Sequence, residues 1–419
     1  MNTNYDVIIV GGGPAGCAAA VSAARRGSRV LLVEQYGFLG GMGTAALVSP
    51  FMSHYAAKTY PVDVNTNIEE LKVLNKGVYE EILQKLEEKN ALLKFIDNTA
   101  FDTEKLKELL FEMVLDSGAE VMLHSFLCGS VVENGKIKEI TVANKSGVMK
   151  LQAQIFIDAT GDGDLAARSG AMVEIGDDKS GNCQPASLMF KMANVDFYTE
   201  RGSVEYPLPE ETGIPCGRVL FFMTTHPGEV IINMTRVTEL DATNAENLTQ
   251  AEIEAHKQVE LVSRYLVAHV KGFEHAYVSQ TGTQIGIRES RRIVGEYVLT
   301  QDDVLGCRKF ADGICRSAYP FDIHNPLGPG TVLKRLPVNE WYEIPYRCLV
   351  PLKLSNLLIA GRCISSTHEA HSSLRIMPNC YCIGEAAGIA ADIAVKEQKK
   401  PGEIDGRIIR DILTEQGAF

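Results

Sequence analysis

The chain has 419 residues, more than one hydrophobic core of ordinary size accommodates, so two or three structural units are expected. Hydrophobic residues make up 45% and charged residues 22%, as in folded globular proteins and unlike disordered ones. The net charge of −12, from 41 Lys and Arg against 53 Asp and Glu, is spread along the chain. An acidic surface repels phosphate backbones, so nucleic acid is not expected as a partner, although a local basic pocket could bind a small anion.

Three further features bear on the cellular context. The opening MNTNYD places no basic stretch ahead of an apolar one, so no signal peptide is predicted. No segment offers about twenty uninterrupted apolar residues, so no membrane span or membrane partner is expected. The ten cysteines are scattered and include no Cys-x-x-Cys pair, which fits reduced thiols and lacks the usual spacing for a metal site. We therefore expect a cytoplasmic protein without a bound metal.

The N-terminal segment predicts a βαβ unit. An apolar run at 7–10 predicts a buried parallel strand, 17–26 predicts a helix that Gly27 ends, and 29–33 predicts a second strand. A glycine-rich turn that fits G-x-G-x-x-G separates the first strand from the helix. This turn is Gly11-Gly12-Gly13-Pro14-Ala15-Gly16.

Each glycine that the fingerprint requires has a physical role in binding a dinucleotide. Gly11 allows the tight turn, Gly13 lets a pyrophosphate approach the backbone, and Gly16 lets helix and strand pack closely. Glu34 lies 34 − 16 = 18 residues further on, where a carboxylate can accept both adenosine-ribose hydroxyls and would repel a 2′-phosphate. A lone fingerprint also occurs in glycine-rich turns of other α/β proteins, but strand, fingerprint, helix, strand and terminal acid together predict a dinucleotide site.

A second glycine-rich loop at 37–44 favours FAD over NAD, because a longer cofactor that crosses the sheet needs it. Later segments predict a helix capped by Asp102, a hairpin at Asn134-Gly135, strands at 148–153 and 155–157, and a turn at 159–163. A meander followed by a strand that ends in Ala-Thr-Gly departs from the strand connectivity of a simple dinucleotide-binding fold. A strand at 356–360 and a helix whose small residues suit close packing under a flat cofactor complete the pattern.

These motifs resemble those of the glutathione-reductase-type flavoproteins, and among them the poorly characterised bacterial FAD-dependent oxidoreductases. The shared segments cover essentially the whole chain and are GGGPAG, LGGMGT, DATGDGDLA, QPASLMF, GIRESRRIVGEY, IPYR, AGRCIS, RIMPN and GEAAG. The resemblance implies an α/β fold, with a Rossmann-like FAD-binding domain (parallel sheet plus three-stranded β-meander) and an inserted α+β substrate domain. We assign 1–51, 95–178 and 344–419 to the FAD-binding domain, and 52–94 and 179–343 to the substrate domain.

The resemblance also implies FAD contacts. They are Gly11, Gly13, Pro14, Ala15, Gly16, Glu34, Gln35, Gly40, Gly41, Met42, Thr44, Leu127, Ala159, Thr160, Gly161, Gly361, Arg362, Asn379, Cys380 and Tyr381. The helix expected to begin near Asn379 would point its N–H groups at the flavin pyrimidine edge. Many relatives have an acidic residue where this chain has Arg362, so a ribityl contact is not carried over and Arg362 could meet the pyrophosphate instead.

Missing features narrow the chemistry. Disulfide reductases of this fold carry a second nucleotide fingerprint in mid-chain and a cysteine pair near the first, and the sequence shows neither. NAD(P)H therefore has no obvious domain of its own, and the substrate is expected to meet the flavin directly. The amphipathic stretch 68–89 predicts a helical cover over the active site.

Candidate catalytic residues must orient a C–H bond and manage one proton beside the flavin. His368 follows the C-terminal FAD strand and titrates near neutrality, with a hydrogen bond to a backbone carbonyl as an equally weighted alternative. His371 and His324 are weaker candidates. Cys380 should sit beside the ring, and we favour a small hydrophobe there over a redox thiol.

Arginines are candidates for holding a substrate carboxylate, which a guanidinium can bind bidentately. Arg288 and Arg292, four residues apart, would share a helix face, and Arg375 precedes the flavin-facing helix. At least one arginine of the RESRR segment, which also contains Arg291, is expected to pair with a carboxylate such as Glu289 instead.

The leading hypothesis is an enzyme that transfers hydride between FAD and a small polar or carboxylated substrate. One alternative is an electron-transfer subunit that passes electrons to a protein partner. A tRNA-modifying flavoprotein is disfavoured by the acidic balance. The sequence leaves open the substrate, the direction, the reoxidant and a homo-oligomeric state.

Overall fold

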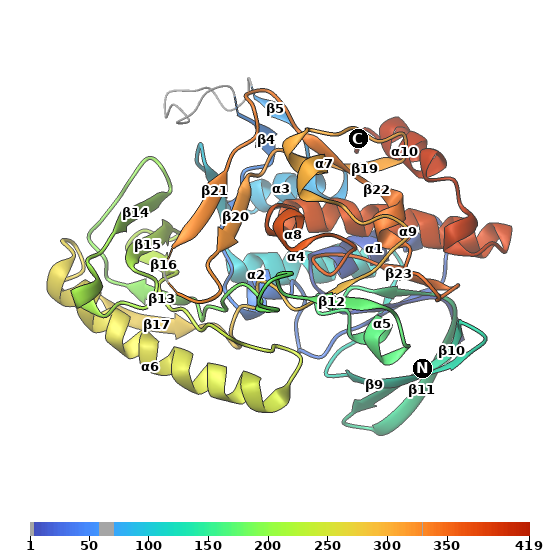
Figure 1. Cartoon of the computed structure of the whole chain (residues 1–419), viewed down its shortest axis with the longest axis horizontal. Coiled ribbons are helices and arrows are strands. Elements are labelled where there is room, and N and C mark those ends of the chain that lie inside the picture. The colour runs from blue at the N-terminus through green and yellow to red at the C-terminus, as the bar shows by residue number, and fades with distance from the viewer. Residues whose placement is uncertain (1–3, 58–70, 329) are drawn as a thin grey trace.

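A seven-stranded mixed sheet lies at the centre of the computed structural model, which describes residues 4–57, 71–328 and 330–419 (Figure 1). The strand order is β8-β2-β1-β11-β10-β9, and β23 lies off this path and pairs with residues 156–158 of β11. The strands are β1 Asn4–Val10, β2 Val30–Val33, β8 Glu120–Met122, β9 Phe126–Glu133, β10 Lys136–Asn144, β11 Gly147–Asp158 and β23 Leu357–Ile359. Strands β8, β2, β1, β11 and β23 are parallel, as expected for a Rossmann-like sheet.

One long strand, β11, joins the parallel part of the sheet to the meander. Residues 147–151 pair with β10 in antiparallel fashion, whereas residues 152–158 pair with β1 in parallel. The sequence predicts two separate strands here, and that prediction is wrong. The change from a half-exposed to a fully buried run marks the point where the strand enters the helix-covered sheet, and the backbone continues without a break.

The hairpin and the helix cap are confirmed. Asn134 and Gly135 both have positive φ, +49° and +72°, as a type I′ turn between β9 and β10 requires. Asp102 accepts hydrogen bonds from the backbone N–H groups of Glu104 and Lys105 and so caps helix α4, Thr103–Asp116.

Two helices, α1 (Pro14–Arg25) and α9 (Met377–Glu397), pack face to face beside the sheet. A Cβ at Gly384 would lie 2.1 Å from the carbonyl oxygen of Ala15, and one at Gly388 would lie 2.5 Å from that of Ala19. The small residues of α9 therefore allow close contact with α1. The expectation that they pack under a flat cofactor is wrong.

Helix α3, Val78–Glu88, contacts α1, α4 and α9. Its buried residues Val78, Tyr79, Ile82 and Leu86 belong to the same hydrophobic core as the central sheet. The helix is thus part of this core and not the predicted cover over the active site, because its apolar face meets other helices. Residues 68–70 of the predicted cover lie outside the described residues.

A second unit holds a five-stranded antiparallel sheet in the order β14-β15-β16-β13-β17, with the long helix α6 packed on it (yellow in Figure 1). The elements are β13 Phe190–Ala193, β14 Ser203–Pro207, β15 Arg218–Met223, β16 Glu229–Ile232, α6 Ala245–His269 and β17 Tyr277–Thr281. Val219 and Phe221 of β15 pack in this unit's core, whereas Phe222 lines a cavity on the other face.

The remaining helices and strands are short. They are α2 Met42–Ala45, β3 Phe51–Met52, β4 Tyr55–Ala56, β5 Lys72–Val73, β6 Leu92–Lys94, β7 Asn98–Phe101, α5 Asp164–Arg168, β12 Val173–Ile175, β18 Arg291–Ile293, α7 Gln301–Leu305, β19 Gly313–Ser317, β20 Phe321–His324, β21 Thr331–Lys334, β22 Tyr342–Pro345, α8 His368–Leu374 and α10 Gly406–Glu415. Leu299, Phe321 and Tyr342 share the core of the central sheet. We therefore propose a second unit centred on 186–287, smaller than the sequence division. Every helix in the described ranges is too short or too polar to cross a membrane.

Candidate active site

A cavity of 1370 Å³ lies between the central sheet and the sheet of the second unit. Its lining combines the glycine turn after β1, the inner face of β15 and the hairpin of β20 and β21. Pockets for single small ligands usually measure about 300–1,000 Å³. This cavity can therefore hold an extended cofactor together with a second molecule.

The glycines of the first turn have the geometry that a dinucleotide site needs. Gly11 has φ +102°, and a Cβ there would lie 2.4 Å from the carbonyl oxygen of Ala159. A Cβ at Gly16 would lie 1.8 Å from the carbonyl oxygen of Gly11, so this position keeps helix and strand in contact. Gly13 lines the cavity, and a Cβ there would meet only Gly41, at 3.7 Å. The space beside Gly13 is thus free of protein atoms and open to a ligand.

Glu34 directly follows β2 and turns its carboxylate to the same turn. It accepts hydrogen bonds from the backbone N–H groups of Gly12, at 2.6 Å, and Tyr36, at 2.9 Å. Burial raises the pKa of Glu34, and these backbone hydrogen bonds oppose that rise. The carboxylate lines the cavity at a fixed position, where a ribose could bind it.

Most of the predicted cofactor contacts line this one cavity. They are Gly11, Gly13, Pro14, Ala15, Glu34, Gln35, Gly41, Met42, Leu127, Ala159, Thr160, Gly161, Gly361, Arg362 and Cys380. Five predicted contacts are absent from the described lining, namely Gly16, Gly40, Thr44, Asn379 and Tyr381. Gly16 and Gly40 shape the turns, since the N–H of Gly40 donates to the carbonyl of Gly12. The hydroxyl of Thr44 donates to the carbonyl of Leu39, at 2.8 Å.

Helix α9 begins at Met377, two residues before the predicted start, and its first turn meets the cavity through Ile376, Met377 and Cys380. The side chain of Asn379 points into the core, where it donates to Ser317 at 3.0 Å and accepts from Asn75 at 3.1 Å. Tyr381 is fully buried and stacks on Tyr79. Both side chains are buried in the protein, so the predicted cofactor contacts of Asn379 and Tyr381 stay a prediction that concerns their backbone N–H groups.

Cys380 is a buried thiol on the cavity wall. Burial raises the pKa of Cys380 to about 12, with a smaller opposing effect of Arg362. The thiol is therefore protonated at neutral pH, which agrees with the interpretation of this residue as a small hydrophobe.

Arg362 lies against the Ala-Thr-Gly turn. Its Nη2 is 2.6 Å from Oδ1 of Asp162, and a Cβ at Gly161 would lie 2.6 Å from its Nη1. The buried Nε has no hydrogen-bond partner among the described residues. Arg362 thus lines the cavity with its guanidinium paired to Asp162 and its Nε buried.

His368 and Arg292 lie outside the cavity lining among the described residues and share the buried carboxylate of Glu289. His368 Nδ1 is 2.9 Å from this carboxylate, and Arg292 also donates to the carbonyl of Ser366 at 3.0 Å. Burial disfavours the charge of Glu289, but the hydrogen bond from His368 and nearby positive groups outweigh it and lower the pKa of Glu289 to about 2. The assignment of His368 and Arg292 to the reaction is therefore withdrawn, because both are bound within the protein.

The arginines of the RESRR segment separate. Residues 291–293 form strand β18 and not a helix, so Arg288 and Arg292 share no helix face. Arg291 pairs with Asp164 at 2.6 Å. Of the three, only Arg288 lines the cavity, where Arg375 also lies.

The wall near Arg288 holds residues that the sequence did not single out or ranked low. Tyr319, Asp322 and His324 line the cavity from β20 and the loop before it. Further arginines of the lining are Arg168, Arg201, Arg218 and Arg335. A short strand pattern such as that of residues 321–324 carries no signal of function, so only the tertiary structure brings these residues together.

The open backbone at Gly13, the buried acceptor Glu34 and the helix start at Met377 fit a dinucleotide cofactor. A model of the FAD dependent oxidoreductase family matches residues 6–413. This chain belongs to that family. It is an FAD-dependent oxidoreductase, and FAD is its cofactor.

Two relatives from other organisms each match part of this oxidoreductase. The digeranylgeranylglycerophospholipid reductase of Methanoculleus marisnigri is 28% identical over 178 residues, 41% of this chain and 42% of the relative. The chain thus spans less than half the length of this relative. The thiamine thiazole synthase of Aeropyrum pernix is 30% identical over 226 residues, 51% of this chain and 74% of the relative.

Solved structures share the fold. A geranylgeranyl bacteriochlorophyll reductase-like protein from Thermoplasma acidophilum superposes with a TM-score of 0.52 at 15% identity, over 99% of this chain and 84% of the other. A variant of a flavin-dependent brominase gives a TM-score of 0.50 at 12% identity, over 98% and 84%. The predicted α/β fold with a Rossmann-like FAD-binding sheet is confirmed.

Proposed function

We propose that this oxidoreductase transfers hydride between FAD and a small polar molecule that binds in the cavity. The observation that carries the proposal is the continuity of the cavity, which runs from Gly13 and Glu34 to Arg288 on the second unit. Bound FAD supplies hydride exchange at the flavin ring. A substrate between the two units would reach the same space without a separate nicotinamide domain.

The chain's own residues bind, orient and shield the reactants. Glu34 holds a ribose, and the free backbone at Gly13 suits a pyrophosphate. The first turn of α9 presents N–H groups and the positive end of a helix dipole to the cavity. Apolar side chains of the second unit, such as Phe222, limit the access of water to the reacting atoms.

The finer features remain proposals. The central sheet, its meander and the second unit support a glutathione-reductase-type arrangement. All ten cysteines are unbridged, which supports a reducing, cytoplasmic location. The relatives named as reductases favour the reductive direction, in which hydride passes from the flavin to the substrate, and dehydrogenation uses the same geometry in reverse.

The test is anaerobic flavin reduction. The FAD-loaded protein is mixed with a panel of small hydroxy acids, amino acids and neutral alcohols, and the loss of the oxidised flavin absorbance is followed. In parallel, the photoreduced protein is mixed with unsaturated acids and amides to test the reverse direction. We expect one compound class to change the flavin much faster than buffer. A protein that holds FAD and responds to no member of the panel would contradict the proposal.

A further inference from the structure

Within this proposed function, we infer that the substrate carries a carboxylate, which binds between Arg288 and Arg375. Both arginines line the cavity. The inference depends on the absence of a carboxylate at hydrogen-bond distance from either arginine among the described residues. It names the class of substrate that the cavity selects.

Arg288 has only uncharged hydrogen-bond partners among the described residues. Its Nη1 donates to the carbonyl of Pro185 at 2.7 Å and to the hydroxyl of Ser187 at 2.8 Å, and its Nη2 donates to Asn233 at 3.4 Å. Burial lowers the pKa of Arg288, and the nearby Arg375 lowers it further. The guanidinium is thus oriented by neutral groups, and its positive charge is not balanced by a carboxylate in contact with it.

Arg375 stands between helices α8 and α9. Its Nη2 is 3.7 Å from Oδ2 of Asp322, too far for a hydrogen bond. Its buried Nε has no hydrogen-bond partner among the described residues. Arg375 therefore has hydrogen-bonding capacity that the protein itself does not use.

Among the described residues, Asp322 is the carboxylate whose charge acts on both arginines, and it is already shared. Its Oδ2 lies 3.3 Å from Nε2 of His324 and 3.4 Å from the hydroxyl of Tyr319. Burial opposes the charge of Asp322, but His324 and both arginines hold its pKa well below the usual range. Burial, followed by the field of Arg288, lowers the pKa of His324 to about 3, so this imidazole is neutral at neutral pH.

The charges of Arg288, Arg375 and Asp322 together leave an excess of one positive charge. Arg288 and Arg375 contribute two positive charges, and Asp322 contributes one negative charge. An unbalanced buried charge is unfavourable, so a bound anion would be stabilised here. A carboxylate brings one negative charge and two acceptor oxygens, which match a guanidinium bidentately.

Other arginines of this region are engaged elsewhere. Arg218 forms an ion pair with Glu205. Arg236 donates to the carbonyl of Asn325 at 2.7 Å and contributes a positive field from behind the wall. A phosphate, which carries about −1.5 to −2 charges at pH 7, exceeds the excess charge of Arg288 and Arg375. The excess positive charge therefore favours an anion over the uncharged end of a lipid chain, and the bidentate fit to a guanidinium favours a carboxylate as that anion.

Benzoate and benzamide provide a matched pair of probes, because they share a shape and differ in the charge of one group. Each is titrated into the FAD-loaded protein, with inorganic phosphate as a third probe, and the shift of the flavin absorbance bands and of the melting temperature is measured. We expect benzoate to bind at least tenfold more tightly than benzamide and than phosphate.

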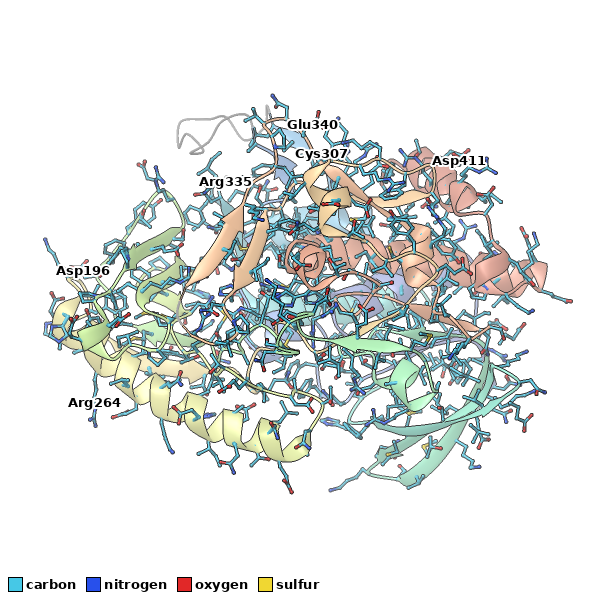
Figure 2. All side chains as sticks on the ribbon, viewed as in Figure 1. Asp196, Arg264, Cys307, Arg335, Glu340 and Asp411 are labelled. Atoms are coloured by element: carbon cyan, nitrogen blue, oxygen red, sulfur yellow. The ribbon has the colours of Figure 1, made fainter. Side chains whose placement is uncertain are left out.

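Two variants and one control locate the site. Arg288→Gln and Arg375→Gln should each weaken the affinity for benzoate on the order of thirtyfold, which is the loss typical of removing one partner of a buried charge pair. The affinity for benzamide should not change. Arg264→Gln changes the net charge equally on the exposed side of α6 (Figure 2) and should have no effect. FAD content is measured for each variant, and if Arg288→Gln does not fold, Arg375→Gln and the comparison of the two probes in the wild type decide.

The possible outcomes separate this inference from the proposed function. Equal binding of benzoate and benzamide, no benzoate binding, a preference for phosphate, or unchanged benzoate binding in a folded variant would overturn the carboxylate site. Selective benzoate binding by a protein whose flavin no substrate reduces would contradict only the hydride-transfer proposal. Flavin reduction by a neutral alcohol in a protein that ignores benzoate would contradict only the carboxylate site.

Discussion

Replacing Gly13 by alanine tests the cofactor site without disturbing the fold. The backbone at Gly13 has φ −76° and ψ −172°, an extended conformation that any residue adopts. The added Cβ would have an ordinary contact with Gly41, at 3.7 Å, and would otherwise project into the cavity. The stability of the apoprotein should therefore change by less than about 0.5 kcal/mol, as at other positions without a packing role.

FAD binding should nevertheless weaken. The methyl group occupies the space through which the pyrophosphate approaches the backbone. A hydrogen bond to a charged group contributes about 1.5–3 kcal/mol, so the loss of one such bond corresponds to a roughly ten- to hundredfold weaker affinity. The affinity is measured by titrating FAD into the apoprotein and following the quenching of its fluorescence.

Gly16→Ala is the contrasting variant. Its Cβ would lie 1.8 Å from the carbonyl oxygen of Gly11, so the strand and helix must move apart. We expect the melting temperature of the apoprotein to fall for Gly16→Ala and to stay constant for Gly13→Ala. Wild-type FAD affinity in Gly13→Ala, or an equal loss of apoprotein stability in both variants, would refute the reasoning about this turn.

Three further substitutions test buried charges. Burial raises the pKa of Glu385 from 4.5 to about 7, against the opposing effects of the Val78 N–H and Arg25, so wild-type stability should fall as pH rises through this range. Glu385→Gln should gain up to about 3 kcal/mol over the wild type by pH 8 and nothing at pH 4.5; parallel melting curves would contradict this. The pKa of Glu289 is lowered to about 2, so its stabilisation is complete above pH 4.5 and is lost as pH falls toward 2. Glu289→Gln should melt lower by an equivalent of about 3–5 kcal/mol at pH 7, with a gap that closes in acid; a gap independent of pH would argue against the ion pair. Asp322→Asn removes the negative charge beside Arg288 and Arg375 and so raises their excess from one positive charge to two. The affinity for phosphate relative to that for benzoate should therefore rise roughly tenfold in the titration described above. An unchanged ratio of the two affinities would count against the charge balance.

Short-range features were predictable from the sequence because neighbouring residues determine them. The hairpin at Asn134-Gly135 and the cap by Asp102 each depend on backbone contacts within a few residues. The position of Glu34 follows from the length of one βαβ unit, which the fingerprint already specifies.

The partners of side chains were not predictable in the same way. His368 has the right place in the chain to approach a flavin, yet its ring binds Glu289, 79 residues away. Asn379 lies in the first turn of the expected helix, but its amide forms hydrogen bonds with Asn75 and Ser317 inside the core. Nothing in the local pattern of either residue indicates the distant partner.

The sequence by itself determined the dinucleotide turn, the central sheet and the cofactor, because these depend on glycine geometry and on apolar runs. Only the tertiary structure decided that Arg288 and Arg375 meet beside Asp322 at the cavity wall, and that Arg292 is bound elsewhere. The physical reason is that the energy of a buried charge depends on which other charges surround it. Those neighbours come from strands and helices that are far apart in the chain and meet only when it folds.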